Sequence, residues 1–361
     1  MADQHDLEMA ILSYNACVRS LQNELPTGDW ELIQAIGAPD NEIGFGAKVY
    51  RSGTQIVIAF RGTDAPELQD FLTGNIPAAS GWMSQQVSAA IRLVADVMDA
   101  NPNTDLMFTG HSLGGGLASL MAAFFQKQAT TFDMAPFGNT AEGKEVDFIG
   151  VGALQFPVVR DSLTMIKYLQ QYTAYQQSLG RPVEPAFSQY VTAILGGGAV
   201  ADAMLAFTRA NIHGYFLDDE FLELVRAIPG FSTLVGTLTP VAIGDTTLND
   251  AINPIEAAGD AVALHSQILL IAMLAAPSLQ TLSQRLPGLL EQLLSENLYG
   301  SDPTGPVTGF LNRLLQNHFA DGVPAASSAL TRFAQELLRL GETGSSHLEG
   351  IREGLAAAVI E

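Results

Sequence analysis

Cysteine is almost absent from this chain of 361 residues, because Cys17 is the only one. An intrachain disulfide is therefore excluded, and the fold has to be held together by its packed interior. Cys17 continues a run of apolar residues spaced as in an amphipathic helix. We therefore expect its thiol to pack in the core rather than to act as a nucleophile.

Basic residues are also scarce. Lys and Arg together number 17 against 38 Asp and Glu, which gives a formal net charge of −21. Such a surface repels phosphate backbones, so we do not expect nucleic acid as a partner. The same charge gives no attraction to an anionic membrane surface.

Long apolar runs are missing from the sequence, and we expect no leader peptide. The nearest approach to a membrane span, residues 191–207, contains three consecutive glycines and Asp202, whereas a span needs about 20 mostly apolar residues. The first residues lack the basic segment and apolar stretch of a secretory signal. We therefore expect a soluble protein, either cytoplasmic or secreted without an N-terminal signal peptide, with no transmembrane segment.

Hydrophobic residues are abundant at 47%, against 15% charged residues, so a large core is easily filled. From about residue 45 to 275, strand and helix patterns alternate, which predicts an α/β fold with a mainly parallel sheet and helices on both faces. A hairpin is expected from the strand patterns at 45–51 and 55–60. Further strands are expected at 105–109, 129–136 and 209–217, and helices at 1–25, 84–100, 113–126, 163–177, 220–228 and 265–275.

The domain organisation follows from these patterns. Residues 1–277 are expected to form one domain, with a lid or cap insertion at about 155–207, where apolar residues alternate with glycine hinges. An ordinary buried helix pair explains that segment equally well. Residues 278–361 show only helix patterns and are expected to form an added helical module.

The strongest chemical signal is Gly110-His111-Ser112-Leu113-Gly114, a Gly-x-Ser-x-Gly motif. It follows an apolar strand pattern and opens a helix pattern, which is the context of a nucleophile elbow. Glycines on both sides of the serine remove side chains that would clash in so tight a turn. The sequence therefore predicts Ser112 as a nucleophile at the sheet edge, beside the N–H groups of a helix start.

A second signal is the apolar strand pattern at 57–60, which ends in Arg61-Gly62-Thr63-Asp64. An oxyanion hole draws one N–H from the residue after the nucleophile and one from an earlier strand-end loop. The N–H groups of Leu113 and Thr63 fit these two positions, and the Thr63 hydroxyl is a third candidate donor.

These motifs resemble the class 3 lipase family of triacylglycerol lipases and phospholipases. The resemblance is carried by residues 60–63, 109–115 and 131–137, and residues 44–51 look similar to its bacterial members. It extends over about residues 30–275. It implies an α/β-hydrolase fold, attack on lipid esters, Ser112 as nucleophile, and Thr63 and Leu113 as the oxyanion hole.

The general base should be a histidine that follows the serine, because α/β-hydrolases run in the order serine, acid, histidine. His265 follows a long loop and starts an apolar helix pattern, where a base carried by a loop is expected. The other histidines after the serine fit less well: His213 lies inside a predicted strand, and His318 and His347 lie in the added module.

The triad acid should end the strand before the loop that carries His265. Residues 218–220, Asp-Asp-Glu, end the strand pattern at 212–217. Glu220, followed by two apolar residues, fits the family pattern best, although the family carries aspartate there; Asp219 is the alternative, and Asp245 and Asp260 are lesser candidates. The non-catalytic alternative is that this acidic triplet only caps the N-terminus of the following helix.

The residues together predict acyl transfer through an acyl-enzyme on Ser112, with no cofactor. We find no His, Cys or Asp cluster with metal-ligand spacing, so no metal is expected. Three hypotheses remain: a triacylglycerol lipase or esterase, a phospholipase A1-type membrane-active enzyme or effector, and a non-catalytic interaction protein on the same fold.

Overall fold

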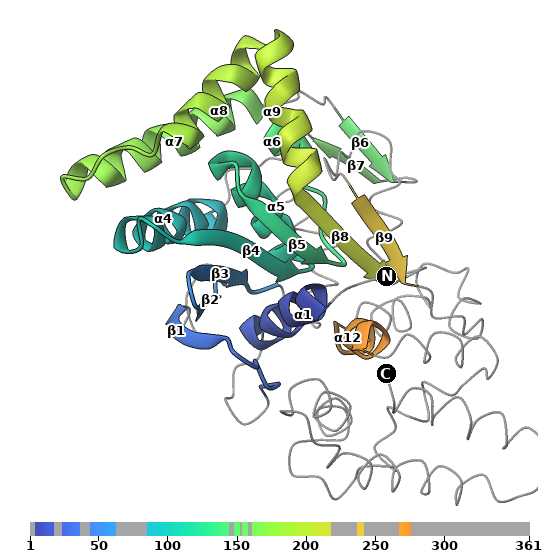
Figure 1. Cartoon of the computed structure of the whole chain (residues 1–361). Helices are drawn as coiled ribbons and strands as arrows, with labels where there is room; N and C mark the ends of the chain where they lie inside the picture. Colours follow the sequence, from blue (N-terminus) through green and yellow to red (C-terminus); the bar gives the residue numbers. More distant parts are fainter. Residues whose placement is uncertain are drawn as a thin grey trace, which may run out of the picture.

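Figure 1 shows the computed structural model of the chain. The structure describes residues 4–17, 24–36, 44–62, 85–143, 148–151, 154–157, 161–217, 237–241 and 267–275. Within these ranges lie the central sheet, the helices on its two faces and the serine motif. The expected helix at 220–228 and the added module at 278–361 lie outside the described residues.

The central sheet has seven strands in the order β1-β2-β3-β4-β5-β8-β9. The first three strands pair antiparallel, and from β3 onward every neighbouring pair is parallel. The strands are β1 (Glu31–Ile36), β2 (Ala47–Ser52), β3 (Gln55–Phe60), β4 (Asp105–His111), β5 (Gln128–Phe132), β8 (Ile212–Leu217) and β9 (Thr237–Val241). The carboxyl ends of β3, β4, β5, β8 and β9 therefore lie along one edge of the sheet.

Helices cover both faces of this sheet, as Figure 1 shows. On one face, α1 (Gln4–Cys17) crosses the middle strands and packs beside α12 (Gln267–Ala275). The other face carries α4 (Gln85–Ala100), α5 (Leu113–Phe125), α7 (Asp161–Ser178), α8 (Pro185–Gly196) and α9 (Gly198–Asn211). A short helix α6 (Gly138–Glu142) and an antiparallel pair, β6 (Phe148–Val151) with β7 (Leu154–Pro157), complete the described elements.

The arrangement of the core explains why β3 has apolar residues at successive positions. Ile56, Ile58 and Phe60 belong to the cluster formed with α4 and α5, whereas Val57 and Ala59 are fully buried outside that cluster. Because successive side chains of a strand point to opposite faces, and α1 packs on β3 from the other side, β3 is buried on both faces. This burial places its carboxyl end firmly beside that of β4.

The prediction of a mainly parallel sheet between helix layers is confirmed, as is the hairpin of β2 and β3. Three expected elements were too long. The strand expected at 129–136 ends at Phe132, because Asp133 adopts a φ of 41° and turns the chain. The described helix α1 spans Gln4–Cys17, and residues 24 and 25 are not helical, so the first helix does not reach residue 25. Residues 209–211 belong to α9 rather than to β8.

Two strands of the central sheet were not predicted, and both are edge strands. β1 and β9 lie at the two ends of the strand order. β9 contains Pro240, which removes a backbone donor and is tolerated only where one side of a strand has no neighbour. Edge strands are buried on fewer sides, so their apolar pattern is weak in the sequence.

Candidate active site

Ser112 lies at the junction of β4 and α5, at the carboxyl edge of the central strand. Its backbone has φ 56° and ψ −125°, although it is not a glycine. Such angles cost an L-residue about 1–3 kcal/mol and persist only where the surroundings enforce them. The serine is 2% exposed. The predicted sharp turn between strand and helix is therefore present at this residue.

The Ser112 side chain does not serve as a helix cap. Serine at the position before a helix ordinarily accepts a hydrogen bond from an N–H of the first turn. Ser112 occupies that position of α5, but its hydroxyl makes no such bond. The hydroxyl is thus not committed to holding the helix start.

Two glycines leave space for this turn. A Cβ added to Gly110 would lie 2.2 Å from the carbonyl oxygen of Gly114, a distance that no side chain tolerates. Gly115 is almost as restricted, since its Cβ would lie 2.8 Å from the Cβ of Met134. Gly110, the glycine expected on steric grounds before the serine, is therefore required by the observed packing.

The backbone of Ser112 is tied to the strand next to it. Its N–H donates to the carbonyl oxygen of Phe132 at 3.0 Å, and its carbonyl oxygen accepts from Ala135 N–H at 3.0 Å. The same oxygen accepts the N–H of Gly116 at 3.1 Å, which begins α5. Three backbone bonds thus enforce the strained conformation.

The start of α5 offers N–H groups beside Ser112. Leu113 is the first residue of the helix, and the first N–H groups of a helix have no partner inside it. These groups and the helix dipole favour negative charge at this point. The N–H of Leu113 therefore lies at a helix start that favours negative charge.

The end of β3 packs directly against the serine turn. A Cβ on Gly62 would lie 2.6 Å from the carbonyl oxygen of His111 and 3.4 Å from the Cβ of Ser112. The preceding residue, Arg61, turns its guanidinium to Gly44, whose carbonyl oxygen accepts from Nη2 at 2.7 Å. Thr63 follows Gly62 but lies outside the described residues. Arg61 thus has an anchoring role that sequence reasoning did not identify.

Sequence reasoning also missed Asp133, which was noticed only as part of the family resemblance. Its carboxyl group is fully buried, and its Oδ2 lies 3.5 Å from Nε2 of His111. The signal that points to it is a carboxylate directly after an apolar strand, next to the strand that carries the serine. Polar groups placed at that edge of a parallel sheet meet the site.

The predicted base and acids lie outside the described residues: His265, Asp219 and Glu220. The described elements give their attachment points. β8 ends at Leu217, one position before the acidic triplet, and α12 begins at Gln267, two positions after His265. The Gln267 side chain donates to the carbonyl oxygen of Ala10 at 3.0 Å, which fixes the start of α12 to α1. His213 is an exposed residue near the start of β8, away from the serine edge.

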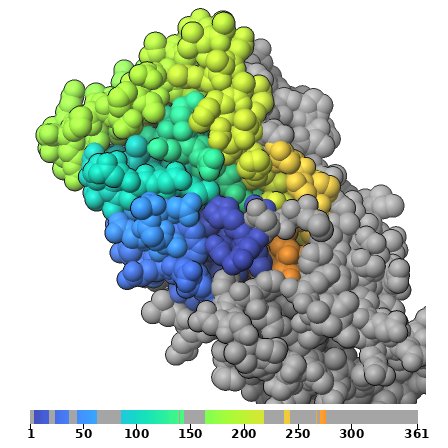
Figure 2. All heavy atoms as spheres, viewed as in Figure 1, coloured from blue at the N-terminus to red at the C-terminus, as the bar shows by residue number. Residues whose placement is uncertain are grey.

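The segment expected to contain a lid, residues 155–207, includes three described helices. Figure 2 shows α7, α8 and α9 along the upper edge of the visible face. In α8, Phe187 stacks on Phe124, and Thr208 of α9 accepts from the side chain of Gln126 at 3.2 Å. Both contacts lie at the C-terminal end of α5. Because an α-helix rises about 1.5 Å per residue, this end is roughly 18 Å from Ser112. Movement of a lid stays a prediction.

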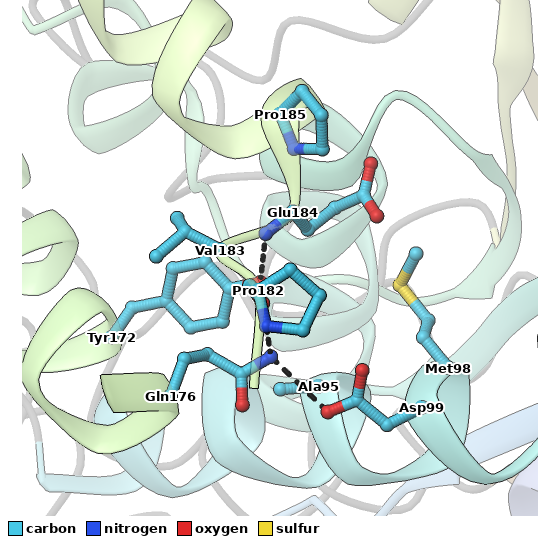
Figure 3. Close-up of a pocket in the computed structure, with 9 residues that line it drawn as sticks. All are labelled: Ala95, Met98, Asp99, Tyr172, Gln176, Pro182, Val183, Glu184 and Pro185. Atoms are coloured by element: carbon cyan, nitrogen blue, oxygen red, sulfur yellow. Dashed lines mark hydrogen bonds between the residues drawn. The ribbon is translucent and has the colours of Figure 1, made fainter. Parts of the chain in front are cut away.

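Figure 3 shows a small pocket between the end of α4, α7 and the start of α8. Its volume is about 80 Å³, well below the several hundred Å³ of a typical ligand site. Gln176 bridges it by donating to Asp99 and to the carbonyl oxygen of Pro182. Because α4 ends just before β4 begins, this pocket lies at the sheet edge opposite Ser112.

The described residues contain no group of three or more His, Cys, Asp or Glu side chains arranged to hold a metal ion. Within the same ranges, every helix is too short or too polar to cross a bilayer.

The comparison with known proteins agrees with the motif blocks. Residues 15–145 match the model of the Tle-like phospholipase domain. The extracellular phospholipase A1 of Serratia liquefaciens is 36% identical over 92 residues, covering 26% of this chain and 28% of that protein. The secreted mono- and diacylglycerol lipase 1 of Fusarium solani is 36% identical over 62 residues, covering 17% and 19%. The aligned part spans less than a third of either relative.

Solved lipases are among the structural neighbours, at low similarity. The lipase of Rhizopus microsporus var. chinensis has a TM-score of 0.28 and 20% identity, covering 37% of this chain and 60% of that one. Lipase II of Rhizopus niveus has a TM-score of 0.26 and 20% identity, covering 37% and 62%. The fold assignment therefore rests on the strand order. The mostly parallel open sheet with helices on both sides fits an α/β-hydrolase-like fold, and the domain model with the curated relatives supports a lipase family assignment for this chain.

Proposed function

We propose that this chain hydrolyses the carboxylic esters of lipids through an acyl-enzyme on Ser112. One observation carries the proposal: a serine held at φ 56° between a central parallel strand and a helix start. A fold keeps such strain where a nucleophile has to project from the sheet edge. The lipase and phospholipase names of the relatives supply the substrate class.

The proposed reaction has two halves. His265 takes the proton of the Ser112 hydroxyl while the oxygen attacks the ester carbonyl, and the alcohol then leaves with that proton. Water, deprotonated by the same imidazole, attacks the acyl-enzyme, and the imidazolium returns the proton to the Ser112 oxygen as its bond to the acyl carbon breaks and the carboxylic acid leaves. Glu220 or Asp219 orients the imidazole and stabilises its charged form.

The negative oxygen of each tetrahedral intermediate would bind the N–H groups of Leu113 and Thr63. The position of Leu113 at the start of α5 supports its part, and the close packing of Gly62 on the serine turn supports that of Thr63. Loss of one such donor raises the barrier by about 3 kcal/mol.

The end of β8 supports an acid in the segment at 218–220. β8 pairs parallel with β5, whose end is bonded to Ser112. β8 therefore ends at the edge of the sheet that carries the serine. We infer that the acid follows this strand end in the chain, as both Asp219 and Glu220 do.

A phospholipase A1-type enzyme is the second candidate. The matched domain model is named for phospholipases, and the Serratia relative is named a phospholipase A1. We propose a lipid ester at a lipid–water interface as substrate in either case. A non-catalytic interaction protein on the same fold is the third candidate, which the strained serine turn disfavours.

The test compares Ser112→Ala, His265→Ala, Glu220→Ala and Asp219→Ala with the wild type. Each is assayed on p-nitrophenyl esters of increasing acyl length and on phosphatidylcholine vesicles. We expect Ser112→Ala and His265→Ala to lose about 10³-fold or more in kcat, and one of the two acid variants to follow them. Release of fatty acid from the vesicles distinguishes the phospholipase.

A fluorophosphonate probe provides the decisive control, because it labels only an activated serine. The wild type should be labelled and Ser112→Ala should not. A folded wild type that resists the probe and hydrolyses no ester would refute the proposal and favour the interaction protein.

A further inference from the structure

Asp133 occupies the bend that follows β5, in contact with elements on both sides. It has a φ of 41° and is fully buried. Aspartate is among the few residues that adopt this left-handed conformation at modest cost. Burying a carboxylate is expensive unless partners compensate it, so its contacts decide what it does.

On one side the carboxylate holds the end of β8. Its Oδ1 accepts the backbone N–H of Leu217, the last residue of that strand, at 2.9 Å. The backbone N–H of Asp133 also donates to the carbonyl oxygen of Tyr215 at 2.8 Å. Two hydrogen bonds thus connect this one bend to the final residues of β8.

On the other side the bend holds the serine turn. Phe132, just before Asp133, accepts the N–H of Ser112, and Ala135, just after it, donates to the carbonyl oxygen of Ser112. The Oδ2 atom of Asp133 faces Nε2 of His111, the residue that precedes the serine, at 3.5 Å. The Asp133 carboxylate therefore lies between the nucleophile turn and the end of β8.

The contact with His111 gives little stability by itself. At 3.5 Å it is long for a charge-assisted hydrogen bond. Within the described part of the chain, Oδ2 is buried and makes no hydrogen bond. A buried carboxylate oxygen so weakly compensated favours a role other than stability.

We propose that Asp133 is a positioning residue for the catalytic acid. Its carboxylate fixes Leu217, the last residue of β8, in a constant position relative to the serine turn, and the predicted acid follows Leu217 in the chain. The inference rests on the proposed function and deepens it. Asp133 acts through the acid and the base, and touches neither the substrate nor the reacting atoms.

The experiment measures kcat, KM and the rate of fluorophosphonate labelling for Asp133→Asn and Asp133→Ala. Asp105→Asn is the matched control, since Asp105 is exposed at the start of β4, the end of the strand away from Ser112. Thermal unfolding gives the folded fraction of each variant, and all rates are expressed per folded molecule.

For Asp133→Ala we expect kcat and the labelling rate to fall about 100-fold with KM within about twofold, since a misplacement near 1 Å costs that much. Asp133→Asn keeps an oxygen that can accept the Leu217 N–H, so it should lose about tenfold or less. In both variants the acidic limb of the kcat/KM profile should move to lower pH, because a displaced acid stabilises the imidazolium less. The control should match the wild type.

Several outcomes overturn the inference. If both variants have wild-type rates per folded molecule and an unmoved pH profile, Asp133 is merely structural. If Asp133→Ala is as inactive as Ser112→Ala while Asp219→Ala and Glu220→Ala both stay active, Asp133 is the acid itself. An inert wild type would instead overturn the proposed function, and this inference with it. If Asp133→Ala does not fold, Asp133→Asn still decides through its pH profile.

Discussion

The α-carbon of Gly114 faces the carbonyl oxygen of Phe60 so closely that an added Cβ would lie 2.2 Å from it. Phe60 ends β3 and Gly114 belongs to the first turn of α5. This contact packs the start of α5 against the end of β3, the strand that precedes Thr63, the second predicted oxyanion donor.

Gly114→Ala should disturb the serine turn, because the methyl group meets backbone atoms that cannot rotate away. We expect a loss of about 1–3 kcal/mol in unfolding free energy and a fall of about 100-fold in fluorophosphonate labelling. Gly196→Ala is the control, since a Cβ there meets nothing within 4 Å. Equal labelling of the two variants would show that the close approach does not position Ser112.

Phe187→Ala should destabilise the helical layer without changing the chemistry. Phe187 is fully buried. Its ring centroid lies 4.6 Å from that of Phe124 and 5.4 Å from that of Tyr172. Truncating such a ring costs about 3–5 kcal/mol, measured by urea unfolding. Phe207→Ala, on the neighbouring helix and 45% exposed, should change stability by about 0.5 kcal/mol or less. Activity per folded molecule should stay at the wild-type level in both, and similar midpoints would contradict the packing argument.

Tyr50→Phe should stabilise the protein. The Tyr50 hydroxyl is buried, and within the described residues it makes no hydrogen bond. Removing an unsatisfied buried group relieves about 1–3 kcal/mol. Equilibrium unfolding at pH 7 measures the change, and a loss of stability would show that the hydroxyl is satisfied.

The same tyrosine makes stability depend on alkaline pH. Burial raises the pKa of Tyr50 well above its ordinary value of 10.0, and the nearby Glu24 adds to the shift. Burial also raises the pKa of Tyr190. A raised folded pKa means that the unfolded state loses its proton first, so stability is complete below about pH 10 and falls as pH rises further. Tyr50→Phe should make this fall less steep, and an unchanged slope between pH 9 and 11 would contradict the assignment.

Asn15→Ala should loosen the connection between α1 and the chain that follows. The Asn15 amide donates to the carbonyl oxygen of Leu25 at 2.9 Å and accepts the Leu25 N–H at 2.8 Å. Both bonds are buried, so leaving their partners unsatisfied costs about 3 kcal/mol. Hydrogen exchange at the Leu25 amide should quicken, whereas Gln4→Ala, on the exposed start of α1, should leave it unchanged. Unaltered exchange in Asn15→Ala would show that other groups protect this amide.

The serine turn was predictable because its signals are local. Gly110 and Gly114 flank Ser112, an apolar strand precedes them and a helix pattern follows, so steric reasoning over a few residues reaches the observed conformation. The hairpin of β2 and β3 was predictable for the same reason. Strand ends were less predictable: no glycine or proline interrupts the sequence between Gln128 and Pro136, and only the φ of Asp133 shows that β5 ends at Phe132.

The amino-acid pattern by itself predicted the order of helices and strands along the chain, because hydrophobic periodicity and glycine sterics act between residues close in sequence. Only the tertiary structure decided which strands and side chains became neighbours, through packing across the sheet. Asp133 meets Leu217 at a separation of 84 residues, and no local pattern encodes that contact, because it exists only once β5 and β8 pair. The strained turn at Ser112 was therefore determined by local sequence, whereas the position of the buried Asp133 carboxylate beside β8 was determined by tertiary packing.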